Sequence, residues 1–276
     1  MEIILKKKFF CRQWEKCNCN KEKNPPLDSF RIEDPAEIEI DPVFAEKQDS
    51  IIWVAGIATV SFTTADSKDA AMTPPDEEVK VESLATLVDA SGVAVAVLSQ
   101  LDPARNLNSR PLRTQHGTLK AEATATLKDL KLILADGTEV PADIVLKDAD
   151  QDLAFIRVRA ESKEAKGLTF PAVDLKDSAT ANVLDEVFNR APNVYLSNIS
   201  AATRKPRVYY RALGATGGSP TFNLEGKLIG VTTTRLLKGK QPAAAIIPAA
   251  DILPGLEQIK AGRPATDGKA ATNSSK

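Results

Sequence analysis

The stretch that decides the fold is residues 213–220 (LGATGGSP), followed directly by residues 221–231 (TFNLEGKLIGV). Glycine tolerates positive φ angles that a β-carbon disfavours, so this glycine cluster predicts a tight turn. The apolar residues on either side of Glu225 and Gly226 predict a β-hairpin after it. A turn of this kind can direct several backbone N–H groups into one concavity, which is how an oxyanion hole is built.

Other strand pairs are predicted upstream of this stretch. Residues 84–88 (LATLV) and 93–98 (VAVAVL) flank a turn of Asp, Ala, Ser and Gly, and residues 130–140 (LKLILADGTEV) contain an Asp-Gly turn. Apolar runs separated by such turns are typical of antiparallel hairpins. Residues 50–63 (SIIWVAGIATVSFT) predict the first core strand, and residues 204–211 predict the strand that enters the glycine turn.

The segments between these strands are polar. Residues 65–80, which contain two adjacent prolines, and residues 102–120 are predicted to be surface loops. Residues 1–45 have no periodic pattern and are predicted to form an irregular arm, and residues 261–276 a disordered tail. The remaining residues, 46–260, are expected to form the folded domain.

Composition limits the function. The formal net charge is −1, and aromatic residues are sparse, so nucleic-acid binding is not expected. The most apolar run, residues 51–60, is too short to span a bilayer, and residues 1–10 lack the long apolar core of a signal peptide. The sequence as given therefore predicts a soluble protein without an export signal or a membrane span.

Cysteine and histidine are scarce and separated. The three cysteines, Cys11, Cys17 and Cys19, lie in the N-terminal arm, and His116 is the one histidine of the chain. An odd cysteine count with one distant histidine predicts neither a disulfide framework nor a zinc site. No metal and no cofactor are expected.

The glycine turn resembles the nucleophile loop of trypsin-fold serine proteases of the HtrA/DegP type. In that family Gly-Asn-Ser-Gly-Gly precedes a hairpin that ends in Ile-Gly, and here the nucleophile position holds Thr216. In a register read back from Ser219 and Pro220, the position holds Gly217 instead. Neither register places a serine there, and the resemblance implies an oxyanion-hole-like pair of N–H groups at Gly214 and Thr216.

Residues 142–158 resemble the family segment in which an aspartate before Leu-Ala orients the catalytic histidine. That aspartate is Asp152. An alignment without gaps from Gly92 places Ser99 at the histidine position, where a hydroxyl has no useful protonation equilibrium near neutral pH. The alternative role for Asp152 is structural: an aspartate at the start of a strand that accepts hydrogen bonds from nearby backbone N–H groups.

Residues 175–188, 194–201 and 243–253 follow in the family order, the last as a strand that ends at a proline before a short helix. The resemblance implies an all-β fold of two six-stranded antiparallel barrels, residues 46–165 and 166–260, with few short helices. If an export signal preceded this sequence, the resemblance would also imply a bacterial extracytoplasmic location.

The resemblance implies three hypotheses for function. The first is a catalytically impaired or inactive relative that binds peptide or protein partners and is able to form a homo-oligomer. The second is an active, divergent endopeptidase that uses Thr216 or Ser219 as nucleophile, with His116 or another group as base. The third is a structural barrel module in a larger assembly, since a fold does not by itself carry a function.

Overall fold

The structure is a computed structural model that describes residues 47–64, 73–108, 112–114, 117–119, 121–191, 193–205, 207–235 and 243–262. The arm predicted for residues 1–45, His116 and residues 263–276 of the predicted tail lie outside the described residues.

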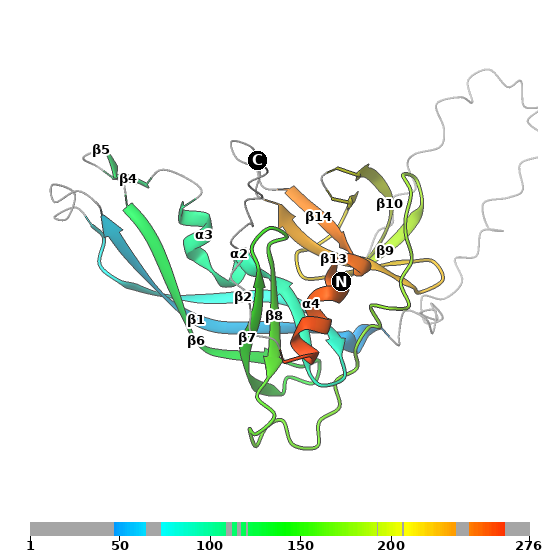
Figure 1. Ribbon diagram of the computed structural model, residues 1–276, viewed down its shortest axis with the longest axis horizontal. Coiled ribbons are helices and arrows are strands. Elements are labelled where there is room, and N and C mark those ends of the chain that lie inside the picture. The colour runs from blue at the N-terminus through cyan, green and yellow to red at the C-terminus, as the bar shows by residue number, and fades with distance from the viewer. Residues whose placement is uncertain are drawn as a thin grey trace, which may run out of the picture. The chain divides into compact units, whose positions relative to one another are not determined.

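Six antiparallel strands close the first barrel, in the order β1-β2-β3-β8-β7-β6. The strand β1 coincides within one residue with the predicted first core strand, and the predicted hairpins form β2–β3 and β6–β7. Figure 1 shows β1, β2 and β6 as the longest strands. The strands are β1 (Ile51–Thr64), β2 (Glu77–Asp89), β3 (Val93–Val97), β6 (Ala121–Ile133), β7 (Glu139–Asp148) and β8 (Leu153–Val158).

Six further antiparallel strands close the second barrel, in the order β10-β11-β14-β13-β12-β9. The hairpin predicted after the glycine turn is β12–β13. The predicted all-β fold of two six-stranded barrels is therefore confirmed. The strands are β9 (Glu186–Arg190), β10 (Val194–Thr203), β11 (Tyr209–Ala212), β12 (Pro220–Asn223), β13 (Leu228–Arg235) and β14 (Ala243–Pro248).

The described helices are few and short, as predicted. The longest, α4 (Ala249–Lys260), begins directly after Pro248, and its buried residues recur at the spacing of one helical face. This face belongs to an apolar cluster that also contains Val95 and Phe155 of the first barrel and Phe222 of the second. Helix α4 therefore packs in a core that both barrels share.

The prediction of a loop for residues 102–120 is partly wrong. Residues 102–120 contain helix α3 (Pro103–Asn108) and the short strands β4 (Leu112–Thr114) and β5 (Gly117–Leu119). A proline suits the first position of a helix, and Ala104 of α3 packs against the first barrel. The segment is mostly polar, so its sequence gives no sign of this contact.

The other differences concern strand boundaries. Strand β2 begins at Glu77, inside the predicted loop 65–80, because it pairs with β1 over its whole outer half. Strand β3 ends at Val97, and the next four residues form helix α2 (Leu98–Leu101) instead of continuing the strand. Strand β11 begins only at Tyr209, later than predicted.

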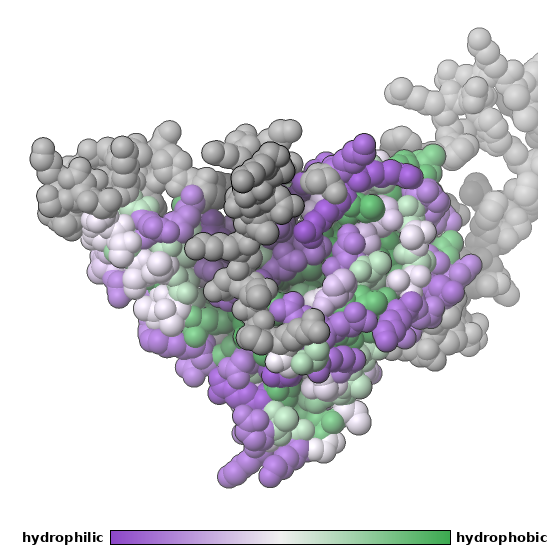
Figure 2. All heavy atoms as spheres, viewed as in Figure 1, coloured by the Kyte–Doolittle hydropathy of each residue, from purple (hydrophilic) through white to green (hydrophobic). Residues whose placement is uncertain are grey.

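Within the described residues, no helix is long and apolar enough to cross a membrane. On the face shown in Figure 2, hydrophilic residues alternate with smaller hydrophobic areas.

Candidate functional site

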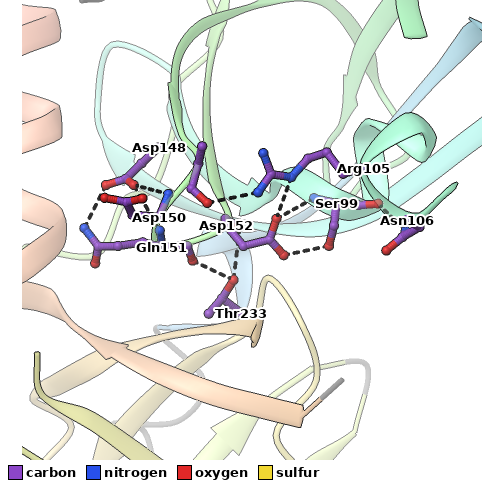
Figure 3. Close-up of polar contacts among 9 residues, drawn as sticks. Ser99, Arg105, Asn106, Asp148, Asp150, Gln151, Asp152 and Thr233 are labelled. Atoms are coloured by element: carbon purple, nitrogen blue, oxygen red, sulfur yellow. Dashed lines mark hydrogen bonds and ion pairs between the residues drawn. The ribbon is translucent and has the colours of Figure 1, made fainter. Parts of the chain in front are cut away.

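Asp152 and Ser99 are in direct contact. The Ser99 hydroxyl donates a hydrogen bond to Asp152 Oδ2 at 2.6 Å, and the Ser99 backbone N–H donates one to Oδ1 at 2.9 Å (Figure 3). Both residues are buried. The structure thus brings together two residues that lie 53 positions apart in the sequence.

The backbone of Asp152 is hydrogen-bonded to the first residue of helix α2 and to strand β13. The backbone carbonyl of Asp152 accepts a hydrogen bond from Leu98 N–H at 3.0 Å and one from the hydroxyl of Thr233, on β13, at 3.0 Å. Asp152 has a φ of 56°, a left-handed conformation that is uncommon for residues other than glycine. The backbone of Asp152 is therefore held by contacts from both barrels.

The electrostatics of Asp152 are dominated by burial. Burial raises the pKa of Asp152 above its ordinary value, although the hydrogen bonds from Ser99 and the charge of Arg105 act in the opposite direction. Arg105 Nε lies 3.5 Å from Asp152 Oδ1, but it makes no hydrogen bond there. The Arg105 guanidinium is anchored instead by a hydrogen bond from Nη2 to the carbonyl of Ala149 at 2.9 Å.

The glycine turn is locked to the first barrel through Gly218. Its φ is +84°, and a β-carbon there would lie 1.8 Å from the carbonyl oxygen of Leu84. Gly218 N–H donates to Thr232 O at 2.7 Å, and the hydroxyl of Thr86 donates to Gly218 O at 2.8 Å. Only glycine fits this position, because both the φ and the close approach exclude a side chain.

The candidate nucleophiles lie in different environments. Thr216 is exposed, whereas Ser219 is fully buried, and its hydroxyl donates to the carbonyl of Thr216 at 2.6 Å. A substrate cannot reach Ser219 Oγ without opening the turn. Gly217, the alternative in the second register, has no side chain to offer.

The predicted oxyanion-hole-like residues, Gly214 and Thr216, have different surroundings. Gly214 has a φ of +75° and lies against the side chain of Tyr195, at the surface of the second barrel. Thr216 and Gly217 line a cavity, and Gly214 is not among its lining residues. Within the described residues, the N–H groups of Gly214 and Thr216 donate no hydrogen bond to a backbone carbonyl.

A cavity of about 440 Å³ joins the two halves of the site. Ser99 and Gln100 line it from the first barrel, and Thr216 lines it from the glycine turn. One whole wall is residues 79–84 of β2. These residues pair with β1 on one side, and no described strand pairs with them on the other, because the β2–β3 ladder starts only at Ala85.

Sequence reasoning missed the part of Gln100. Its Oε1 accepts a hydrogen bond from the hydroxyl of Ser83 at 2.7 Å, and a β-carbon on Gly217 would lie 3.1 Å from its Nε2. Gln100 thus fills the space between β2 and the glycine turn. Its position next to Ser99 is the one signal that could have pointed to it.

Acidic residues of the site are not arranged as metal ligands. In the part of the chain that the structure describes, no group of three or more His, Cys, Asp or Glu side chains could hold a metal ion.

The two closed six-stranded barrels, joined by a shared core and a glycine turn, define a trypsin-like protease fold of the HtrA/DegP type. Among solved structures, the chain is similar to a single-substitution variant of the HtrA-type protease AlgW with a decapeptide. Sequence identity is 17%, the match covers 81% of this chain and 67% of that chain, and the TM-score is 0.52. It is also similar to Deg5, at 17% identity over 80% of this chain and 94% of that chain, with a TM-score of 0.50.

A third similar structure is the protease domain of MamO from Magnetospirillum magneticum, at 12% identity over 77% of this chain and 98% of that chain, with a TM-score of 0.44. No protein-family model and no curated protein matches the sequence significantly. At these identities the likeness concerns the fold alone.

Proposed function

We propose that this chain is a trypsin-fold protein without peptidase activity that binds an extended peptide beside Ser99 and Thr216. The observation that carries the proposal is the residue that contacts Asp152, which is Ser99. Ser99 is the side chain that donates a hydrogen bond to that carboxylate, and a serine hydroxyl is too weak a base near neutral pH to take a proton from a nucleophile.

Loss of the base removes most of the catalytic gain, because base and nucleophile act as a unit. Thr216 is exposed and lines the cavity, but a threonine hydroxyl needs an activating base. Among the described residues that line the cavity there is no histidine. The carboxylate and the amine in this lining are Glu82 and Lys80, which both belong to β2. The endopeptidase hypothesis with Ser219 is further disfavoured by the burial of that hydroxyl.

The peptide-binding part of the proposal depends on the outer half of β2. A strand with one unpaired edge can accept an extended peptide as an additional strand, with backbone hydrogen bonds that supply affinity. Residues 79–84 line the cavity together with Ser99 and Gly217, and their edge away from β1 has no described strand partner. The volume of about 440 Å³ is within the usual range for a binding site.

The catalytic part of the proposal is tested with the purified full chain. We expect no labelling by a fluorophosphonate probe and no hydrolysis of fluorescently labelled casein. Labelling that disappears in Thr216→Ala would contradict the proposal. The double variant Ser99→His with Thr216→Ser is the positive probe: activity gained by it would show that the catalytic geometry is preserved.

The binding part is tested by fluorescence polarisation with a library of labelled decapeptides. In Thr216→Trp, the indole would occupy the mouth of the cavity, and we expect peptide affinity to fall at least about tenfold, as for the loss of a binding contact of 1.4 kcal/mol. The matched control is Leu213→Trp, since Leu213 is 76% exposed and does not line the cavity. Failure of every peptide to bind would favour the structural-module hypothesis.

A further inference from the structure

A second cavity, of about 740 Å³, shares no residue with the first. Residues of the β7–β8 connection, helix α3 and helix α4 line it, and its apolar lining includes Leu98, Leu153 and Phe155. Its volume is typical of sites for small organic ligands. Neither the sequence analysis nor the proposed function assigns it a role.

Gln151 lines this cavity and carries an unsatisfied polar atom. Gln151 is 6% exposed, and its Nε2 donates a hydrogen bond to Asp148 Oδ2 at 2.8 Å. Its Oε1 is buried and has no hydrogen-bond partner in the described residues. Figure 3 shows the Gln151 amide beside Asp148, on the opposite side of Asp152 from Ser99.

The orientation of this amide is fixed by its neighbour. A carboxylate only accepts hydrogen bonds, so the Gln151 nitrogen must face Asp148 and the oxygen must point elsewhere. A buried carbonyl without a donor is unfavourable, and such groups in native proteins usually have a partner. Gln151 lines the cavity, so a ligand that binds there and reaches this buried oxygen would supply the missing donor.

The carboxylates of the cavity outnumber the cations that neutralise them. Three cations line the cavity beside four aspartates: Arg207 lies 4.0 Å from Asp150, Arg105 pairs with Asp152, which does not line the cavity, and Lys147 is exposed. Three further aspartates, Asp102, Asp148 and Asp251, line the cavity and form no ion pair within the described residues.

One of these carboxylates is also short of a donor: Asp102 Oδ1 is buried without a hydrogen-bond partner in the described part of the chain. No three of these carboxylates, nor any other three acidic, His or Cys side chains of the described residues, form a group that could hold a metal ion. A cavity lined by several hydrogen-bond acceptors and by apolar side chains suits a ligand with several N–H donors on a hydrocarbon stem.

We propose that this cavity binds an organic cation, namely a primary ammonium or guanidinium group on an apolar stem. The cation donates to Gln151 Oε1 and is attracted by Asp102 and Asp251, and the stem packs on Phe155. Such a group is found both in a lysine or arginine side chain of a peptide and in a small diamine. The proposal does not depend on peptide binding in the first cavity.

The test uses isothermal titration calorimetry of the full chain with three probes: 1,5-diaminopentane, Nα-acetyl-lysine amide and the uncharged 1,5-pentanediol. We expect at least one cation to bind and the diol not to bind. Binding of the lysine derivative alone assigns the site to a basic peptide side chain, and binding of the diamine alone assigns it to a small diamine. Equal binding of the diol, or no binding of either cation, overturns the proposal.

Two variants locate the binding. Gln151→Met keeps the side-chain volume but removes the acceptor, and we expect affinity to fall about ten- to a hundredfold, the effect of one charge-assisted hydrogen bond. Asp251→Asn, in the first turn of α4, removes one charge with little risk to folding and should weaken binding too. The matched control is Asp49→Asn, since Asp49 is exposed outside the cavity. Unchanged affinity in both cavity variants contradicts the proposal.

Discussion

The two halves of the candidate site are fixed in different ways. In the half that the first barrel contributes, side chains hold one another: Asp152 accepts two hydrogen bonds from Ser99. In the half from the second barrel, backbone holds backbone, since Gly218 lies directly against the carbonyl of Leu84. The comparison teaches that the two barrels are fixed here by different means, namely side-chain hydrogen bonds to a buried carboxylate in one half and close backbone packing in the other.

The largest effect is expected for Gly218→Ala. A β-carbon 1.8 Å from Leu84 O forces the two barrels apart at this point, and the φ of +84° adds strain, so we expect a loss of more than about 4 kcal/mol or failure to fold. Urea denaturation of the purified variant measures it. Gly137→Ala is the matched control: its φ is +85°, but nothing lies within 4 Å, so only about 1 kcal/mol should be lost. Equal losses of unfolding free energy in the two variants would show that backbone strain, and not the contact with Leu84, causes the destabilisation.

The next effect is that of Asp152→Ala in the first-barrel half. The substitution leaves the N–H and the hydroxyl of Ser99 without their acceptor in a buried place, and we expect the free energy of unfolding to fall by about 2–4 kcal/mol. Chemical denaturation at neutral pH is the measurement. A loss below about 0.5 kcal/mol, the size typical of surface substitutions, would mean that the carboxylate does not hold this half together.

A smaller effect is the pH dependence of stability, which we expect to have opposite signs for Asp152 and Asp89. Because the pKa of Asp152 is raised by folding, the pH-dependent part of its contribution to stability is full below its unfolded pKa, near 3.8, and is lost as the pH rises through the folded value. The hydrogen bonds from Ser99, on which the effect of Asp152→Ala at neutral pH depends, are a separate contribution. For Asp89, partial burial raises the pKa, but hydrogen bonds from Lys260 and Ser91 outweigh it and lower the pKa overall. The contribution of Asp89 is therefore present above pH 3.8 and is lost as the pH falls through its folded value.

The measurement is the stability difference between the unsubstituted protein and Asp152→Asn, and between that protein and Asp89→Asn, from pH 3 to 7. The first difference should fall with rising pH and the second should rise. Two differences with the same slope would mean that one of the pKa directions is wrong.

The smallest effect is that of Ser99→Ala. The hydroxyl bond to Asp152 Oδ2 is lost, but the backbone N–H bond to Oδ1 remains, so we expect a loss of about 1 kcal/mol. Thermal unfolding is sensitive enough to measure it. A loss as large as that of Asp152→Ala would show that the hydroxyl alone holds the carboxylate.

Local sequence signals predicted most strands correctly. Turns such as Asp136-Gly137 and Glu225-Gly226 fix hairpins through a few neighbouring residues, and such signals are visible in the sequence. Helix α3 was missed because its stability comes from packing against β6, 15 or more residues away, and not from its own polar composition. Chain-distant contacts of this kind leave no local pattern.

The same distinction applies to the site. The family order of segments pointed to Ser99, Asp152 and Thr216, and the structure joins the first two by hydrogen bonds and brings the first and third to one cavity. That Gly214 turns toward Tyr195 was not visible, since a glycine gives no sign of which neighbour its backbone approaches.

The outer half of β2 has a consequence for self-association. An unpaired strand edge is a template for the edge of another copy, and proteins protect such edges with charged side chains. Glu77, Glu78, Lys80 and Glu82 are all exposed on this segment. Three acidic side chains and one basic side chain repel an identical strand more than they attract it, so we expect this edge to resist pairing with a second copy of the chain.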